Sequence, residues 1–195
     1  MATLETGTGA STIVFAASGA RHVAISPAPA EHDWIKVYCE EQGIDLSRVW
    51  FVDQPSHVAL LHKWQPEPLA VVLIDGAHRF PFPILDWFYT APHIQKGGWV
   101  LVDDAFLGSV NVLVSFLRSE PSWSLEGVFG ERTACFRKLA DGRETYDWLD
   151  SPFDSRWNFD YLPPMTRIMA SARHRLFQVG PLRTLVRRAA VRRGR

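Results

Sequence analysis

Acidic side chains follow several short apolar segments of this chain, at the points where those segments end. In the clearest case, the aliphatic run at residues 71–74 leads into Asp75, a glycine, an alanine and His78. Charged residues avoid protein cores unless they are paired, so packing alone does not explain an acid at the end of a buried strand. Asp75 is therefore expected to contact a ligand. His78 could act as a general base, a ligand or a capping residue.

Two adjacent carboxylates, Asp103 and Asp104, follow the apolar segment at residues 99–102. They repel each other, and a bound divalent cation would remove that cost. Hard cations such as Mg²⁺ prefer oxygen ligands. Neighbouring parallel strands end at the same edge of a sheet, so Asp75 could join the pair in one magnesium site. The alternative is that one aspartate caps the following helix and the other is solvated.

A glycine turn, ETGTGAST at residues 5–12, follows the first apolar segment. Glycine lets the backbone turn sharply and approach a ligand closely. A helix beginning near Ser11 would offer free N–H groups and a positive dipole end to an anionic or carboxylate group. Ser11 replaces the third glycine of a dinucleotide-binding fingerprint, so a plain strand–turn–helix connection stays an alternative.

Strands must bring these side chains together. Strands are expected at residues 2–6, 22–26, 49–52, 69–74, 99–102, 123–129 and 133–139, with helices at 11–18, 31–42, 57–64, 83–94 and 110–118. We expect Pro27 and Pro29 to end the second strand, and Gly97 and Gly98 to turn the chain into the fifth. The alternation predicts an α/β, Rossmann-like fold: a mostly parallel seven-stranded sheet with helices on both faces and a C-terminal antiparallel hairpin.

Composition limits the class of protein. The 195 residues are 47% hydrophobic and 22% charged, which suits one globular domain. No apolar run reaches the ~18 residues that span a bilayer, and no signal peptide is apparent, so a cytoplasmic protein is expected. Cys39 and Cys135 lack the paired short spacings of a zinc site.

The C-terminal part is basic. Residues 167–195 hold nine arginines and no acid, although the net charge of the chain is zero. We expect an irregular extension or flap at residues 141–172 and a basic tail at 173–195. The tail could dock on the acidic body or lie on a membrane surface. No base-reading or stacking residues accompany it, so nucleic acid is not expected as a partner. A homo-oligomer stays open.

Together the motifs resemble the class I S-adenosylmethionine-dependent methyltransferases, in particular the O-methyltransferase-like methyltransferase-24 family. The order carries the resemblance: glutamate with Gly-x-Gly, a strand ending in Asp-Gly-x-His, a helix with Asp86 and Trp87, then Gly-Gly and a strand ending in Asp-Asp. It spans roughly residues 3–139 and implies a methyltransferase domain at residues 1–140. It also implies methyl transfer from S-adenosylmethionine to a hydroxyl of a small molecule.

The resemblance also assigns roles to individual residues. The family binds the cofactor's ribose hydroxyls with an acid at the position of Ser26; a serine makes one neutral contact where a carboxylate accepts two charge-assisted ones. Metal-dependent relatives place oxygen ligands at positions matching Asp75, Asp103 and Asp104. The implied cofactor-binding residues are Glu5, Gly7, Thr8, Gly9, Ser11, Ser26, Asp53, Ser56 and Asp75.

The implied mechanism uses His78 and Asp75 as catalytic residues. Mg²⁺ would lower the pKa of an acceptor hydroxyl, and His78 would take its proton. One alternative is an inactive methyltransferase-like binding or partner protein. It is favoured by Ser26 and by a first motif at residue 5, before which the family usually has substrate-covering helices. We expect one of three explanations for this short start: the start site is placed too late in the sequence, a partner protein supplies the helices that cover the substrate, or the protein is degenerate. A nucleotide-cofactor oxidoreductase is disfavoured by the Asp-Asp pair and the lack of Tyr-x-x-x-Lys.

Overall fold

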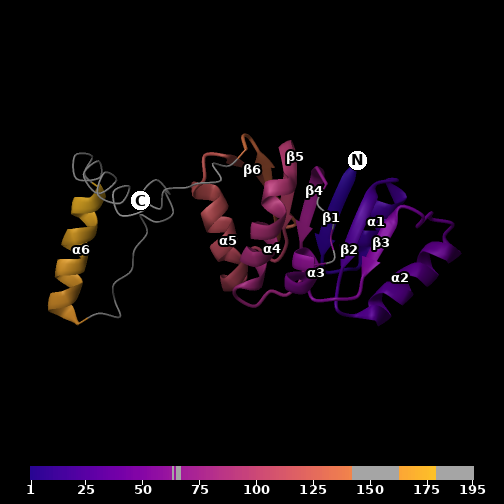
Figure 1. Cartoon of the computed structure of the whole chain (residues 1–195), viewed down its shortest axis with the longest axis horizontal. Helices are drawn as coiled ribbons and strands as arrows, with labels where there is room; N and C mark the ends of the chain where they lie inside the picture. The colour runs from indigo at the N-terminus through magenta and orange to yellow at the C-terminus, as the bar shows by residue number, and fades with distance from the viewer. Residues whose placement is uncertain (63, 65–66, 142–162, 179–195) are drawn as a thin grey trace. The chain divides into compact units, whose positions relative to one another are not determined.

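The computed structural model describes residues 1–62, 64, 67–141 and 163–178. The chain divides into two compact units, Met1–Gly142 and Arg143–Arg195. Within the described part of the first unit, strands and helices alternate (Figure 1). The strands are β1 Ala2–Thr6, β2 Arg21–Ile25, β3 Val49–Val52, β4 Leu69–Ile74, β5 Ile94–Val102, β6 Trp123–Phe129 and β7 Thr133–Lys138. The helices are α1 Ala10–Ala17, α2 Pro29–Glu41, α3 Ser56–His62, α4 Phe82–Thr90 and α5 Gly108–Ser119.

The strands form one seven-stranded sheet in the order β3-β2-β1-β4-β5-β7-β6. The first five are parallel, and β7 runs antiparallel to both β5 and β6. Gly130 and Glu131 make the hairpin turn, both with positive φ angles. The predicted Rossmann-like fold, with its mostly parallel sheet and terminal hairpin, is confirmed.

The sequence prediction is wrong around β5. Helix α4 ends at Thr90, a short 3-10 helix covers Ala91–His93, and β5 already begins at Ile94. Gly97 and Gly98 therefore lie inside the strand, beside a register shift against β4. A Cβ on Gly98 would lie 2.8 Å from the carbonyl oxygen of Gln95, so only glycine fits this irregular stretch.

A second correction concerns Pro29. It does not end the second strand but begins α2. Proline suits the first turn of a helix, because its missing N–H has no intrahelical partner there and its fixed φ matches the helix. The remaining helices lie within two residues of the predicted positions.

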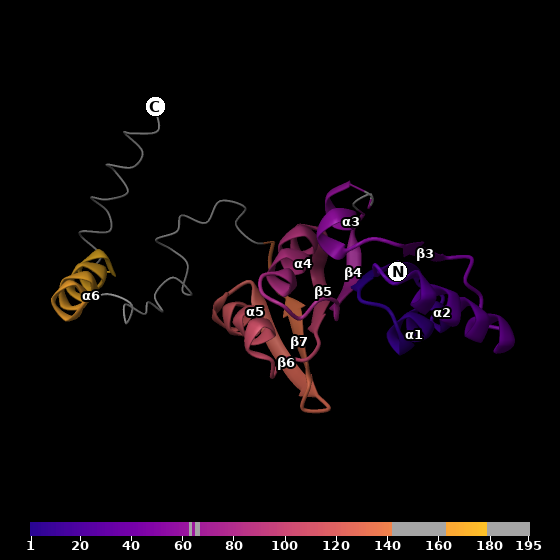
Figure 2. The same cartoon turned by 90° about the horizontal axis from the view of Figure 1, so that it is seen from below.

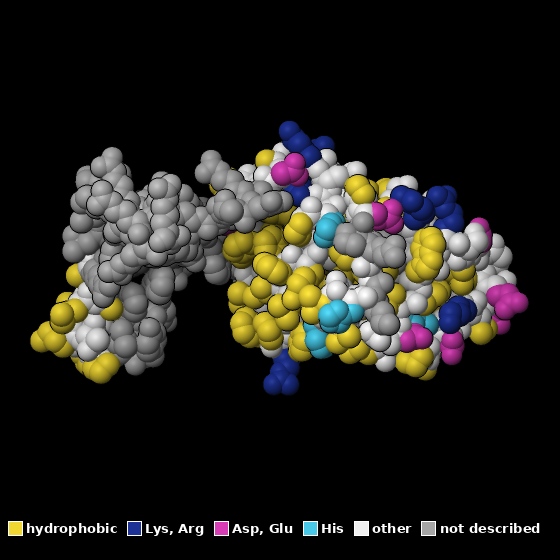
Figure 3. Space-filling view, viewed as in Figure 1, with side chains coloured by type: hydrophobic (Ala, Val, Ile, Leu, Met, Phe, Trp, Pro, Cys, Tyr) yellow, Lys and Arg dark blue, Asp and Glu magenta, His cyan; other side chains and the backbone are white. Residues whose placement is uncertain are grey.

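Helices cover both faces of the sheet, as predicted. Helix α1 contacts α2, whereas α4 contacts both α3 and α5. Figure 2 shows α1 and α2 together on one side of β3, and α3 and α4 on the other. The central strands are buried from both sides, and Leu4, Val72 and Val100 are fully buried. Figure 3 shows hydrophobic side chains gathered over α4 and α5 on one face of the molecule.

The strand order reverses between β1 and β4, and hydrogen bonds continue past the strand ends there. Gly7 N–H donates to the Ile25 carbonyl at 2.9 Å, and Asp75 N–H donates to the Thr6 carbonyl at 2.9 Å. Asp103 N–H donates to the Ile74 carbonyl at 3.0 Å. These bonds place the glycine turn and both acidic motifs side by side, where ligands bind in such sheets.

In the second unit, the structure describes helix α6, Pro164–Gln178, with exposed Met165, Ile168 and Met169. Residues 164–172 of the expected irregular extension are thus helical. The rest of that extension, residues 142–162, and the tail from residue 179 lie outside the described residues. Among the described helices, none has the length and apolar character to cross a membrane.

Candidate functional site

The glycine turn packs tightly against the end of β4. Gly7 has a φ of +86°, and a Cβ there would lie 2.1 Å from the Asp75 carbonyl oxygen. Only glycine combines that left-handed conformation with such close backbone contact. Gly9, by contrast, faces open space, because a Cβ at this position would have no neighbouring atom within 4 Å among the described residues. The turn therefore leaves room for a ligand above Gly9, at the start of α1.

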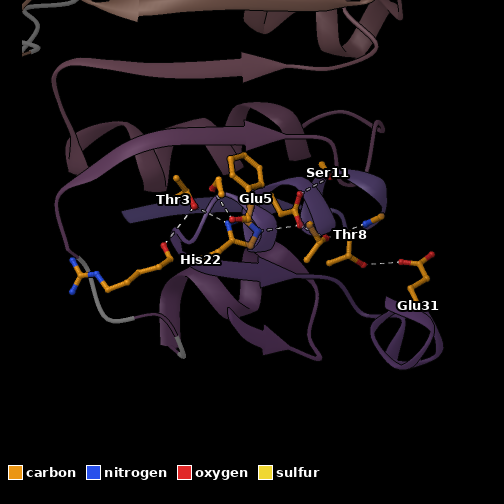
Figure 4. Close-up of polar contacts among 11 residues, drawn as sticks. Thr3, Glu5, Thr8, Ser11, His22 and Glu31 are labelled. Carbon is orange, nitrogen blue, oxygen red and sulfur yellow. Dashed lines mark hydrogen bonds and ion pairs between the residues drawn. The ribbon is translucent and has the colours of Figure 1, made fainter. Parts of the chain in front are cut away.

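Beneath the turn lies a network of buried polar side chains, called here the Glu5 network: Thr3, Glu5, Ser11, Thr12 and His22. Glu5 is fully buried, and its carboxylate accepts hydrogen bonds from Ser11 Oγ at 2.6 Å and from Thr12 Oγ1 (Figure 4). His22 Nε2 lies 3.1 Å from Glu5 Oε1, and His22 Nδ1 lies 2.8 Å from Thr3 Oγ1. The carboxylate of Glu5 therefore fixes the turn, and its contact with a cofactor stays a prediction.

At the ends of β2 and β3, the first turn of α2 brings in two residues that the sequence analysis missed. Glu31 Oε2 accepts a hydrogen bond from Thr8 Oγ1 at 3.1 Å (Figure 4) and another from Ser26 Oγ, also at 3.1 Å. Buried His32 holds the exposed Asp53 with 2.5 Å between Nδ1 and Oδ1. An acid two residues after Pro29 is a common first-turn residue, so its type gave no functional signal.

Asp75, His78 and Asp104 meet at the ends of β4 and β5, and we call them the Asp–His–Asp cluster. One ligand atom from each lies within 4.8 Å of the others. His78 Nε2 is 3.5 Å from Asp75 Oδ1 and 3.3 Å from Asp104 Oδ2, and this buried nitrogen has no hydrogen-bond partner among the described residues. Ser109 Oγ donates to the His78 carbonyl and so fixes the loop.

Asp103, a predicted metal ligand, accepts hydrogen bonds from the hairpin. Arg132 donates to Asp103 Oδ2 through Nε at 2.8 Å and Nη2 at 2.5 Å, and Thr133 Oγ1 donates to Oδ1 at 2.5 Å. Arg132 also lies 2.9 Å from Asp104. Burial opposes the charged form of Asp103, but the hydrogen bonds from Arg132 and Thr133 outweigh it and lower its pKa. The importance of Arg132 was not visible in the sequence, since it lies on a hairpin turn.

Asp75 has an unusual titration. Burial, and next the neighbouring Asp103 carboxylate, raise the pKa of Asp75 to about 6, while His78 and Arg132 oppose the rise. Partly buried groups with shifted pKa values in a cluster are typical of functional sites. Near neutral pH, Asp75 can therefore both accept and release a proton.

The donor set of the Asp–His–Asp cluster fits a divalent cation. It offers two carboxylate oxygens and one imidazole nitrogen, and that nitrogen is buried without a hydrogen-bond partner among the described residues. Imidazole suits transition metals, whereas Mg²⁺ prefers oxygen alone. The set differs from the predicted one by containing His78 in place of Asp103.

Ser56, expected near the adenosine, begins α3 and is buried. Asp86 on α4 is also buried; burial raises the pKa of Asp86, and the nearby hydroxyls of Ser56 and Thr6 oppose the rise. Ser56 therefore faces an interior acid, and its contact with a cofactor stays a prediction.

Comparisons with known proteins agree with this fold. Residues 4–105, more than half of the chain, match the model of a family described as a methyltransferase domain. No curated protein matches the chain.

Several solved structures are similar. The O-methyltransferase TomG from Streptomyces achromogenes, involved in tomaymycin synthesis and solved with SAM, has 18% identity and a TM-score of 0.59, covering 71% of this chain and 73% of its own. Cofactor-bound Rv0187 from MTB has 19% identity and a TM-score of 0.60, with 70% and 72% covered. An rRNA methylase from Streptococcus thermophilus has 9% identity and a TM-score of 0.55, with 71% and 87% covered. At these identities the likeness shows the shared fold.

Proposed function

The chain belongs to the methyltransferase domain family whose model matches residues 4–105, and from that membership we propose that it transfers a methyl group from S-adenosylmethionine to a hydroxyl of a small molecule. One observation carries the proposal. The Asp–His–Asp cluster lies directly beside the glycine turn, because Asp75 N–H donates to the Thr6 carbonyl at 2.9 Å and Gly7 packs on the Asp75 carbonyl. A cofactor site and an acid–base site thus adjoin.

Several of the cofactor residues proposed from the sequence lie along this edge. Gly7, Thr8 and Gly9 form the turn, and the open space above Gly9 admits a ligand beside the free N–H groups that begin α1. Ser26 and Asp53 follow β2 and β3 at the same edge. Bound S-adenosylmethionine would supply an electrophilic methyl group; the residues of this chain only have to hold and orient it.

The acceptor would be bound by the cluster. His78 and Asp75 lie within reach of one hydroxyl proton, and Asp75, with its pKa of about 6, can hold that proton near neutral pH. A divalent cation held by the cluster would instead supply Lewis-acid activation of the acceptor hydroxyl, because the ligand atoms of Asp75 and His78 would then bind the cation and not the proton. Asp103, kept charged by Arg132, adds negative charge that favours a bound cation.

The acceptor we propose is a phenol or another hydroxyl on an apolar body. Phe80 and Phe106 each lie two residues beyond a member of the cluster, His78 and Asp104 respectively, and their side chains are 60% and 66% exposed. Exposed phenylalanines next to a polar cluster can bind an apolar ring while the cluster binds its hydroxyl. A sugar, whose surface is more polar, would pack less favourably against these phenylalanine rings.

Titration calorimetry tests the proposal. The purified chain, stripped of metal by a chelator, is titrated with S-adenosylhomocysteine, then with Mn²⁺ or Mg²⁺, and finally assayed for methylation of catechol. We expect micromolar S-adenosylhomocysteine binding, tighter binding of Mn²⁺ than of Mg²⁺, and methylation that a chelator abolishes. A folded protein that does not bind S-adenosylhomocysteine would overturn the proposal.

A second candidate is a non-catalytic methyltransferase-like binding protein. The guanidinium of Arg132 already contacts Asp103 and Asp104, so an internal cation neutralises part of the acidic site. In that case S-adenosylhomocysteine would bind, but Mn²⁺ would produce no heat and catechol would not be methylated.

A further inference from the structure

Glu31 is held in place over the cofactor edge of the sheet. Its Oε2 accepts a hydrogen bond from Thr8 in the glycine turn (Figure 4) and another from Ser26 at the end of β2, so the carboxylate bridges the ends of two strands. The next residue, His32, is fully buried and fixes the first turn of α2 through Asp53. Glu31 is therefore an exposed acid with a defined position.

Half of that carboxylate is still available. Both of these hydrogen bonds go to Oε2, while Oε1 has no hydrogen-bond partner among the described residues. The side chain itself is exposed to solvent. A carboxylate accepts about four hydrogen bonds, so this one can accept two more from a ligand.

A ribose presents a pair of neighbouring hydroxyl donors, which one carboxylate can accept together. In dinucleotide-binding sheets, the acid that binds a ribose hydroxyl stands about 20 residues after the glycine turn. Ser26, at the end of β2, stands at about that distance but offers only a hydroxyl, and Glu31 supplies a carboxylate five residues further along. That hydroxyl donates to Glu31 and thereby positions the acid.

We propose that Glu31 is the residue that binds the ribose hydroxyls of the cofactor, with Ser26 and Thr8 as its positioning residues. This assignment rests on the proposed function, because it requires an adenosine-containing cofactor at the glycine turn. The carboxylate comes from the first turn of α2 and not from the end of β2. The site therefore keeps a negatively charged acceptor although Ser26 is neutral.

The test compares two ligands on three proteins. S-adenosylhomocysteine and its 2′-deoxy analogue are titrated by calorimetry into the wild-type chain, into Glu31→Gln and into the matched control Glu40→Gln, an exposed acid near the other end of α2. Hydrogen bonds to charged groups are the stronger kind, so we expect Glu31→Gln to weaken S-adenosylhomocysteine binding about 10- to 100-fold. The wild type should discriminate against the 2′-deoxy analogue, and Glu31→Gln should lose that discrimination. Glu40→Gln should behave as the wild type.

Each other outcome has a distinct meaning. If the wild type fails to bind S-adenosylhomocysteine, the proposed function fails. If the wild type binds but Glu31→Gln binds equally well, the assignment of Glu31 is wrong while the function stands. If Glu31→Gln binds both ligands more weakly and still prefers S-adenosylhomocysteine to its 2′-deoxy analogue, Glu31 only stabilises the structure of the site and does not bind the ribose. A Ser26→Asp change in the Glu31→Gln chain, which returns a carboxylate to this edge, should restore part of the affinity.

Discussion

The Glu5 network and the Asp–His–Asp cluster both begin with an acid at the end of a buried parallel strand, yet the two acids differ in burial and in the side chains that contact them. Glu5 is fully buried, and neighbouring side chains use both of its oxygens. The cluster is only partly buried, it brings two carboxylates and an imidazole within 4.8 Å of one another, and the pKa of its Asp75 is raised to about 6 by burial and by the neighbouring Asp103. Position at a strand end therefore does not determine the environment of an acid; the side chains that contact the acid do.

The two regions also differ in the electrostatic cost of their acids. In the Glu5 network, Ser11 and Thr12 donate hydrogen bonds to the two carboxylate oxygens of Glu5, and these bonds fix the turn. In the cluster, the proximity of Asp103 helps to raise the pKa of Asp75 to about 6, a cost that a bound cation would remove. Arg132, on the hairpin, reduces this repulsion because its guanidinium contacts Asp103 and Asp104. We therefore expect changes in the cluster to alter activity and changes in the network to alter folding.

The largest expected effect comes from His78→Ala. General acid–base residues contribute roughly 10²- to 10⁴-fold to rate, so kcat for catechol methylation should fall by about that factor. The thermal midpoint should change little, since the His78 side chain is 34% exposed. The measurement is steady-state kinetics, with His62→Ala on the exposed side of α3 as control. An unchanged kcat would mean that the cluster, like the Glu5 network, is structural.

Glu5→Ala should mainly lower the free energy of unfolding, whereas His78→Ala should mainly lower kcat. It removes the acceptor of Ser11 and Thr12 and the carboxylate beside buried His22, and breaking a buried charged group's network costs about 3 to 5 kcal/mol. Urea unfolding measures this loss, and Glu41→Ala at the exposed end of α2 serves as the control with almost no change. A loss under about 1 kcal/mol, the size of one ordinary hydrogen bond, would contradict the structural role of Glu5.

Arg132→Gln tests whether the cluster is partly neutralised from within. Removing a cation in contact with Asp103 and Asp104 should strengthen Mn²⁺ binding, by about tenfold for a partly exposed pair. Calorimetry with Mn²⁺ measures it, and Arg137→Gln, which changes an arginine stacked on Trp99 in the same hairpin, is the control. Weaker Mn²⁺ binding would show that Arg132 instead holds the ligands in place.

Much of the fold was predictable, because it depends on local patterns. Aliphatic runs such as residues 69–74 and the hairpin at Gly130 were placed correctly. The start of β5 was not, since the irregular pairing at Gly98 depends on contact with Ala70 on another strand.

The candidate site was predictable only in part. The sequence named the acids and histidine of the cluster, but it could not show which aspartate would turn toward Arg132, a contact between residues 29 apart. It also missed Glu31, whose meaning comes from two hydroxyls on other elements. Strand-end acids can be read from a sequence, whereas their partners need the tertiary structure.

The smallest expected effect concerns Asp86, a buried acid outside both regions. Burial raises its pKa in the folded protein above that of the unfolded chain, so the charged form is disfavoured by folding. Below the unfolded pKa, about 3.9 for aspartate, both states are protonated and the charge costs nothing; as pH rises through the folded pKa, stability is lost. Asp86→Asn should therefore be more stable than the wild type at pH 8, by about 1 kcal/mol or less, with a smaller gap at pH 5. Urea unfolding at both pH values measures the gap, and Asp33→Asn, on the exposed face of α2, should show no such trend. If Asp86→Asn were instead destabilised equally at both pH values, Asp86 would resemble Glu5, an acid whose carboxylate is held by hydrogen bonds from its neighbours.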